Sequence, residues 1–449
     1  MHNDSDDSSD AADYPVHDAY AAIRIPSYRR YWTGNVLSIL GRQMQTVTVV
    51  WEVYSRTGNT FDVGLVGLVQ VIPVLSLALV GGHVADRVNR KLVVAAAMVL
   101  SIVSSLGLAA VSFYQWHIAG TYASLALLGV SRAFLQPAKN SLVPQLVPRS
   151  IFSNAVTWNL GGFQLASVAG PALGGWALAA FGHAWGVYLV NVAAAAVFLL
   201  LLLGVKPRSK KTDVAAAPTL RSLGEGVSFV WNHPIILGAI SLDMFAVLLG
   251  GAKALLPVFA TEILGVGPAW YGWLYAAEAL GALSMSLALM HRPPIAKAGR
   301  SLLLSVAAYG VAIFVFGISR SFMLSFVALF CTGAFDCISV VIRHTLVQML
   351  TPDRMRGRVS AISGMFVSTS NEMGEFESGT LARLTSPVFA VVFGGIGTLV
   401  VVLFVALRNP RLRRYGRLDG RDSPHDDAPP APSAPDSASP ETTPAESTR

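Results

Sequence analysis

The chain has few charged residues and almost no cysteine. Of its 449 residues, 13% are charged and 53% are hydrophobic, and the mean hydropathy is +0.54. Soluble domains carry about 25% charged residues, so this composition excludes an ordinary soluble domain and indicates a polytopic membrane protein. The two cysteines, Cys331 and Cys337, lie in one apolar segment. They cannot bridge within a straight helix, so no disulfide or metal framework is implied.

Several functional signatures are also missing. The first twenty residues are polar and rich in aspartate, so no signal peptide is visible. No Gly-x-x-x-x-Gly-Lys-Ser/Thr sequence occurs, which argues against ATP as the energy source. Cysteine and histidine are too scattered for a metal cluster or a catalytic triad. The net charge of +7 is spread over short loops and forms no single patch. We therefore expect no enzyme, no cofactor and no nucleic-acid partner.

Long apolar runs are what the chain does have. About twenty helical residues span a hydrocarbon core roughly 30 Å thick, and the sequence offers twelve runs of this kind. They predict an all-α integral membrane protein with helices at about 31–55, 62–81, 92–113, 117–138, 152–180, 185–204, 235–262, 269–290, 301–318, 322–347, 356–382 and 386–407.

Basic residues alternate between the two sides of these helices. Connections after the even-numbered helices and both chain ends are rich in Arg and Lys, whereas the opposite connections carry only Arg56, Arg320 and Arg383. Basic loops stay in the cytoplasm. We therefore expect both termini in the cytoplasm and the protein in the bacterial inner membrane.

The second half of the chain repeats the first. At an offset of 204 (352 − 148), Pro148 aligns with Pro352, Gly129 with Gly333, and the glycines at both ends of 170–175 with those of 374–379. A parallel repeat predicts two six-helix bundles. The expected organisation is a disordered acidic tail at 1–28, bundles at 29–205 and 234–410, a linker with a short amphipathic helix at 206–233, and a disordered tail at 411–449.

A charged turn separates the second and third predicted helices. Its sequence is Gly82-His83-Val84-Ala85-Asp86-Arg87-Val88-Asn89-Arg90-Lys91. The pattern Gly-x-x-x-Asp-Arg-x-x-Arg-Lys resembles the loop signature of the major facilitator superfamily of secondary transporters. Asn89 replaces the usual glycine, and Asn tolerates a left-handed backbone better than most residues. We therefore expect the turn to be kept.

The resemblance implies a cytoplasmic gate made of Gly82, Asp86, Arg87 and Arg90. In the family the aspartate lies against the start of helix 11, where a carboxylate complements the helix dipole, and the arginines tie the bundles together. The alternative interpretation is that these bases only set the topology.

Two further motifs lie in the fifth and eleventh predicted helices. Residues 166–175 resemble the helix-5 motif of proton-coupled drug exporters, in which Gly170 and Gly174 allow close helix packing and Pro171 permits a bend. A role in helix packing alone and a role in gating are both consistent with this motif. Residues 371–379 resemble the subfamily of enterobactin exporters and transmembrane secretion effectors. The glutamates of this segment are expected in the periplasmic half, at an outer gate or simply at the interface: Glu372, Glu375 and Glu377.

Ionisable residues within the apolar runs are unevenly distributed. The third, sixth, ninth and twelfth helices have none. In the superfamily helices 1, 4, 7 and 10 line a central cavity, and the pattern fits. The candidates for a polar substrate and proton path are Arg42, Arg132, Asp243, Glu278, Asp336 and Arg343. Arg132 and Asp336 are repeat equivalents (336 − 132 = 204), so we expect them to face each other. Fixed ion pairs between helices are the alternative.

These features predict a secondary active transporter, acting as a monomer in the lipid bilayer. It would export a small siderophore-like, drug-like or other amphipathic molecule by alternating access, in exchange for protons. Asp243, Glu278 or Asp336 would carry the proton, and Arg42 or Arg132 would suit an anionic or catecholate-like ligand. An importer or flippase of a lipid-like substrate is an alternative. A non-transporting scaffold or sensor is the alternative from another class.

Overall fold

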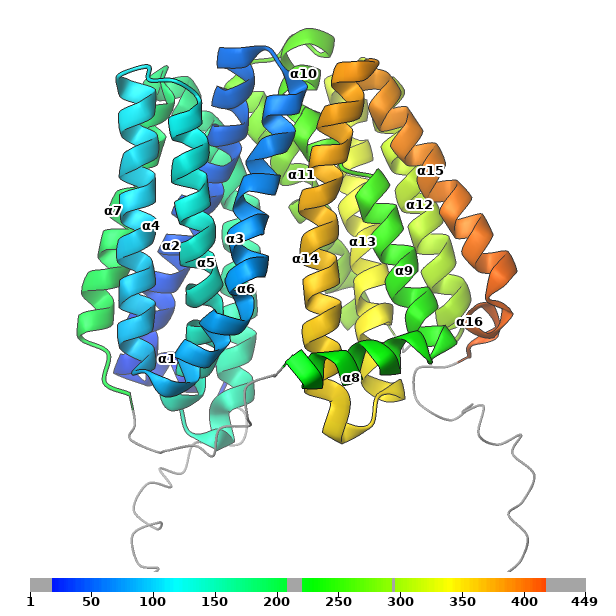
Figure 1. Cartoon of the computed structure of the whole chain (residues 1–449), viewed down its shortest axis with the longest axis horizontal. Coiled ribbons are helices and arrows are strands. Elements are labelled where there is room, and N and C mark those ends of the chain that lie inside the picture. Colours follow the sequence, from blue (N-terminus) through cyan, green and yellow to red (C-terminus); the bar gives the residue numbers. More distant parts are fainter. Residues whose placement is uncertain (1–17, 208–219, 293–294, 417–449) are drawn as a thin grey trace, which may run out of the picture.

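A computed structural model describes residues 18–207, 220–292 and 295–416. Two sets of six long helices stand beside each other in these residues (Figure 1). The N-terminal bundle contains α2 (Pro26–Thr57), α3 (Thr60–Arg87), α4 (Arg90–Phe113), α5 (Ala119–Leu142), α6 (Phe152–Phe181) and α7 (Ala184–Leu203). The C-terminal bundle contains α9 (Pro234–Leu249), α11 (Pro268–Met290), α12 (Ala298–Ile318), α13 (Phe322–Leu350), α14 (Asp353–Leu384) and α15 (Pro387–Arg408). The predicted twelve-helix, two-bundle fold is confirmed.

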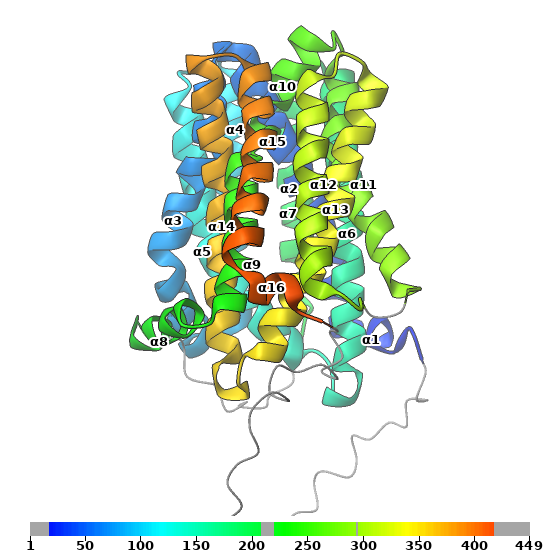
Figure 2. The same ribbon diagram turned by 90° about the vertical axis from the view of Figure 1, so that its right-hand side faces the viewer.

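Short helices mark one end of the molecule, which we call the tail end. It carries α1 (Ala21–Arg24), α8 (Leu220–Trp231) and α16 (Pro410–Arg414) (Figures 1 and 2). Helix α8 lies across the direction of the long helices (Figure 1). Because Ala21, Ala22 and Leu412 are buried, the packed body extends into both stretches predicted as tails. The remainder of the tails and residues 208–219 of the linker fall outside the described part of the chain.

Within the described residues, eight segments are long and apolar enough to cross a membrane. The long helices not among them are α2, α5, α6 and α14. These four carry polar residues that the packing turns inward, such as the buried Gln45, Lys139, Ser167 and Ser370. A helix that hides its polar face against other helices can span a bilayer with a lower overall apolarity.

Local chain chemistry sets many helix ends. Prolines occupy the first turns of α2 and α9, where their missing N–H is not needed. Gly58 and Gly182 end α2 and α6 at φ values of 60° and 72°, which glycine adopts without strain.

The charged stretch at 82–91 is mostly helical. Helix α3 continues to Arg87, and α4 begins at Arg90. Asn89 has φ −55°, and its side chain caps α4 by accepting a hydrogen bond from the Lys91 N–H. The turn expected here is therefore kept, but Asn89 supports it through its side-chain cap and not through a left-handed backbone.

The seventh predicted helix is interrupted near its middle. After α9 the chain passes Gly250 and Gly251, then forms a 3₁₀ turn (Ala252–Leu255), α10 (Leu256–Val258) and a π-helical turn (Phe259–Ile263). A Cβ on Gly251 would overlap the carbonyl group of Gly374 in α14. The close approach of α14 explains the glycine, and the continuous helix predicted at 235–262 is wrong at this point.

The bundles contact each other along two seams at the end away from the tails, the far end. In one seam a Cβ on Gly379 of α14 would lie 3.1 Å from the Cα of Gly64 in α3. In the other, a Cβ on Gly175 of α6 would lie 2.6 Å from the Cα of Gly272 in α11. The seams are repeat equivalents, because 379 − 175 = 204 and 272 − 64 = 208.

Hydrogen bonds between the bundles lie at the far end too. The Tyr271 hydroxyl donates to the Val47 carbonyl at 3.1 Å, and the Thr60 hydroxyl donates to the Gly379 carbonyl at 2.9 Å. The Tyr54 hydroxyl donates to the Glu262 carboxylate.

The four helices that form the two seams, α3, α6, α11 and α14, have open space beside their tail-end halves. A Cβ built on Gly82 of α3, on Gly161 of α6 or on Gly364 of α14 would meet no atom within 4 Å. Leu160 of α6 and Met290 of α11 are 61% and 77% exposed. The described contacts therefore close the space between the bundles at the far end and leave it open toward the tails.

Candidate functional site

The C-terminal bundle contains a pocket with charged walls at the break after α9. It holds a cavity of about 60 Å³, and α9, α11, α12, α13 and α14 contribute to its walls. The Lys253 ammonium lies 3.0 Å from a carboxylate oxygen of Glu278. Asp336 and Glu375 also line the pocket. Among the lining residues, three carboxylates therefore surround one ammonium.

The sequence anticipated part of this pocket. Glu278 and Asp336 were expected on a polar path, and both line this pocket. Glu375 was expected in the periplasmic half, and it lines the same pocket as these two. Lys253 was not among the predicted site residues. A lysine two residues after a pair of glycines, within an apolar run, was the signal that could have identified it.

Asp243 and Arg343 form a buried ion pair between α9 and α13. Asp243 is 4% exposed and Arg343 is 2% exposed. Asp243 lines a small cavity beside the charged pocket, together with Asp336 and Tyr309. For this pair the structure favours the interpretation as a fixed ion pair between helices, since each charge already has its partner.

The N-terminal bundle contains a basic cluster, which we define as Arg42, Arg132 and Lys139. Lys139 is buried, its ammonium donates to the Asn35 side-chain oxygen at 2.8 Å, and it lies 5.0 Å from the centre of the Phe198 ring. Arg42 lies close enough to both other members for their charges to interact. Within the described residues no carboxylate pairs with Arg42 or Lys139. Lys139 was missed because the predicted fourth helix ended one residue before it.

Arg132 links the basic cluster to the other bundle. A guanidinium nitrogen lies 3.7 Å from a carboxylate oxygen of Glu372 in α14 and 3.4 Å from the Gln70 side-chain oxygen. A Cβ on Gly67 of α3 would lie 2.6 Å from the Glu372 carboxylate, so glycine leaves room for this contact. Asp336, which was expected to face Arg132, lines the pocket of the C-terminal bundle, and the carboxylate within reach of Arg132 among the described residues is that of Glu372.

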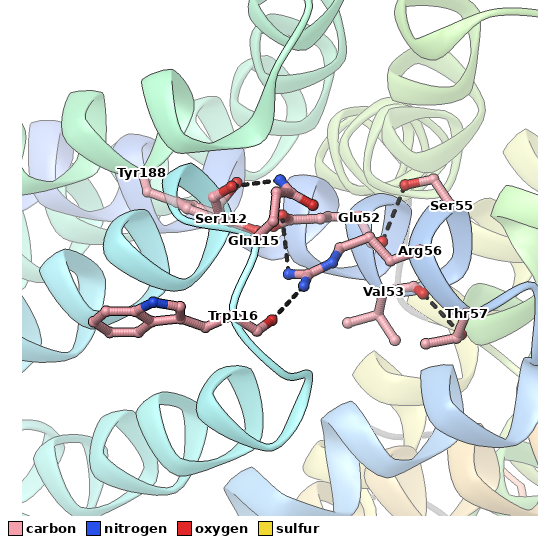
Figure 3. Close-up of polar contacts among 9 residues, drawn as sticks. All are labelled: Glu52, Val53, Ser55, Arg56, Thr57, Ser112, Gln115, Trp116 and Tyr188. Atoms are coloured by element: carbon pink, nitrogen blue, oxygen red, sulfur yellow. Dashed lines mark hydrogen bonds and ion pairs between the residues drawn. The ribbon is translucent and has the colours of Figure 1, made fainter.

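A third group of charges holds the far end of the N-terminal bundle together (Figure 3). The Tyr188 hydroxyl donates to Glu52 at 2.6 Å, and an Arg56 nitrogen lies 3.7 Å from the same carboxylate group. Arg56 also donates to the Trp116 carbonyl in the connection after α4. Because the partners of these groups all lie in one bundle, this cluster ties α2 to α7 and to the connection after α4, away from the pocket.

The predicted gate residues lie at the tail end, at the α3–α4 connection. Gly82 has open space beside it, Arg87 is exposed, and Arg90 is the first residue of α4. Asp86 belongs to α3, and its side chain lies outside the described part of the structure. In this conformation the gate stays a prediction.

The helix-5 motif packs against α2. A Cβ on Gly174 would lie 2.8 Å from the Cα of Met44, and Gly170 faces Gln43 at similarly close range. The carbonyl of Pro171, inside α6, faces Gly272 across the seam. On α14, Glu377 accepts a hydrogen bond from the Ser378 hydroxyl at 3.3 Å and is not part of the charged pocket.

Known proteins share both the sequence pattern and the fold. The family model for transmembrane secretion effectors matches residues 17–434. The enterobactin exporter EntS of Citrobacter koseri is 28% identical over 395 residues, which cover 87% of this chain and 93% of the relative. EntS of Escherichia coli O139:H28 is 27% identical with the same coverage.

Solved transporter structures superimpose on the chain at low sequence identity. The D-xylose–proton symporter has a TM-score of 0.66 and 14% identity, over 88% of this chain and all of that one. A bacterial homologue of the human lysosomal transporter Spinster, in an inward-facing and unoccupied conformation, has a TM-score of 0.65 and 15% identity, over 87% of this chain and 96% of that one. At these identities the likeness shows the fold.

The family match spans nearly the whole chain and agrees with the two-bundle fold. The protein is a multi-pass membrane transporter and not an enzyme. The chain belongs to the transmembrane secretion effector family of the major facilitator superfamily.

Proposed function

We propose that the chain exports a small amphipathic molecule across the bacterial inner membrane, in exchange for protons and by alternating access. The observation that carries this proposal is the pocket at the break in α9, where Glu278, Asp336 and Glu375 surround Lys253. One chain supplies both bundles, so a monomer suffices.

The proposed orientation places the tail end in the cytoplasm. The tail end carries most of the basic connections, among them Arg87, Arg90, Arg149, Lys297 and Arg358, whereas the far end carries only a few. Positive residues remain on the cytoplasmic side. The conformation with an open tail end is then inward-facing and can receive substrate from the cytoplasm or the inner leaflet.

The charged pocket is the proposed coupling site. Lys253 lies within 3.0 Å of Glu278 and can neutralise one carboxylate, but Asp336 and Glu375 line the same space. An uncompensated carboxylate within a membrane is costly, and taking up a proton removes the charge. Release of that proton in one conformation and its uptake in the other would couple transport to the proton gradient.

The relatives suggest the first substrate to test. Proteins with 27–28% identity are named enterobactin exporters. We propose a siderophore-like or other amphipathic metabolite, with enterobactin as the initial probe. The motif residues Gly82, Asp86, Arg87 and Arg90 would close the cytoplasmic side after the substrate has entered.

Everted membrane vesicles test the proposal. Addition of enterobactin to energised vesicles should raise the internal pH as protons leave in exchange for substrate, and labelled enterobactin should accumulate inside. Asp336→Asn should reduce both signals at least tenfold, which corresponds to about 1.4 kcal/mol. Glu377→Gln is the matched control, because Glu377 lies outside the pocket, and should behave like the wild type.

Two results would contradict the proposal. Enterobactin accumulation without any change of internal pH would remove the proton coupling. If neither enterobactin nor a panel of amphipathic metabolites is transported by protein that inserts normally, the export function itself is wrong.

A further inference from the structure

One buried cation of the N-terminal bundle, Lys139, has a neutral partner at the place where the C-terminal bundle has an acid. Lys139 and Arg343 are repeat equivalents (343 − 139 = 204), as are Asn35 and Asp243 (243 − 35 = 208). Arg343 is paired with the Asp243 carboxylate, whereas among the described residues the Lys139 ammonium has the Asn35 amide oxygen and the Phe198 ring as its partners. The same helix contact is therefore neutralised in one bundle and left positive in the other.

Arg42 adds a second uncompensated cation at this place. It is only partly exposed, and within the described residues it has no acidic partner. Arg132, the third member of the basic cluster, is the one with a carboxylate within reach, and that carboxylate comes from the other bundle. Uncompensated cations within a membrane span are costly, and such residues mark ligand paths.

The contact of Arg132 with Glu372 is loose. The charged atoms are 3.7 Å apart, and the two side chains are 37% and 18% exposed. Bidentate pairing of arginine with a carboxylate uses distances of about 2.7–2.9 Å. A ligand carboxylate or phenolate that reaches Arg132 can therefore replace Glu372 and form the stronger contact.

We propose that Arg42, Arg132 and Lys139 form a binding site for a small organic anion, and that the bound anion displaces Glu372 from Arg132. Displacement removes the ion pair that joins α5 to α14 across the far-end closure. Anion binding from the tail end thereby promotes opening at the far end. This inference rests on the proposed export function, because it names the substrate's charge and the step that the substrate triggers.

The distance between the two far ends reports this step without any proton gradient. Spin labels at Tyr114→Cys in the connection after α4 and at Leu384→Cys in α14 would occupy exposed positions on different bundles. Cys331 and Cys337 are replaced by Ser. In purified full-length protein in lipid nanodiscs, salicylate or enterobactin should produce a second, longer distance population. Salicylamide, the uncharged counterpart of salicylate, should leave the distribution unchanged.

Variants separate ligand effects from general damage. Glu372→Gln should show the longer population without any ligand, whereas the control Glu377→Gln should resemble the wild type. Arg132→Gln should lose the response to both anions, and Arg132→Lys should keep part of it, because the charge remains. Arg42→Gln and Lys139→Gln should each weaken salicylate binding, measured by calorimetry, at least tenfold.

Clear outcomes overturn the inference. Equal responses to salicylate and salicylamide, absence of a response to both anions in the wild type, or a wild-type response in a folded Arg132→Gln protein would each do so. If vesicles exchange protons for enterobactin but the distances between the spin labels do not change on addition of anions, the anion-site inference is wrong and the proposed export function stands. If the distances between the spin labels change with anions but the vesicles show no proton exchange, only the proposed proton coupling is wrong.

Discussion

In the N-terminal bundle α3 crosses α5 where Gln70 meets Gly129, and in the C-terminal bundle α11 crosses α13 where Glu278 meets Gly333. Both glycines allow the backbone carbonyl of the partner to come into the position of a side chain. The crossings are equivalent in the repeat, because 278 − 70 = 208 and 333 − 129 = 204. The backbone packing has been kept while an amide has been exchanged for a carboxylate.

The same exchange recurs at other equivalent positions. Gln70 contacts Arg132, whereas its counterpart Glu278 contacts Lys253 near Asp336. The basic cluster of the N-terminal bundle therefore has the neutral amides Asn35 and Gln70 as partners, and the equivalent positions of the C-terminal bundle are carboxylates. The repeated fold thus provides two different electrostatic environments. The basic cluster of the N-terminal bundle suits an anionic substrate, and the carboxylates of the C-terminal bundle suit a proton.

The buried ion pair should give the largest effect. Arg343→Met leaves the Asp243 carboxylate buried without its partner and should lower the free energy of unfolding by about 3–5 kcal/mol. Lys139→Met should cost less, because it leaves only the neutral Asn35 amide unpaired, at about 1–3 kcal/mol. Thermal unfolding in detergent measures both. The double variant Arg343→Met with Asp243→Leu should recover most of the loss. Equal losses for both single variants would contradict the difference between the bundles.

The two seams should respond alike when they are overpacked. Gly272→Val and Gly64→Val each place a branched side chain against the backbone of the opposite bundle, at a cost of about 1–3 kcal/mol to the closed far end. In both variants, the distances between spin labels at positions 114 and 384 should shift toward the longer population. Gly265→Ala, at a glycine with open space but a φ of 63°, separates local strain from closure of the seam. A shift in only one of the seam variants would show that the two seams are not equivalent in the transport cycle.

Making the Lys139–Asn35 pair resemble the Arg343–Asp243 pair should weaken anion binding. Asn35→Asp gives Lys139 a carboxylate partner, as Asp243 is for Arg343. Salicylate binding should weaken about tenfold, or about 1.4 kcal/mol, while the protein stays folded. Asn35→Gln keeps a neutral amide and serves as the comparison. Unchanged binding in the aspartate variant would mean that Lys139 has no part in the anion site.

The smallest effect is expected at the far-end cluster of the N-terminal bundle. Tyr188→Phe removes one hydrogen bond to Glu52 (Figure 3) and should lower the free energy of unfolding by about 0.5–1.5 kcal/mol, with transport unchanged. A calorimetric scan and the vesicle assay check the two parts of this prediction. A large loss of transport at normal stability would place this cluster on the transport path after all.

Much of the candidate site was predictable as a set of residues but not as a set of contacts. Glu278, Asp336 and Arg132 stand out in the sequence because an ionisable residue in an apolar run is costly. Their partners Lys253 and Glu372 are brought to Glu278 and Arg132 by helix crossings, which no local pattern in the sequence predicts. Lys139 was missed because one helix extends four residues beyond its predicted end, to Leu142.

The sequence by itself determined the spans, the repeat and the sidedness of the basic residues, because each depends on composition within one segment. Apolar runs of sufficient length form helices in a bilayer whatever their neighbours are. Only the tertiary structure decided which charges pair, where α9 breaks and which end is closed. Those features depend on a few ångströms of approach between helices far apart in the chain, as at Gly251 and Gly374, and no local pattern records such distances.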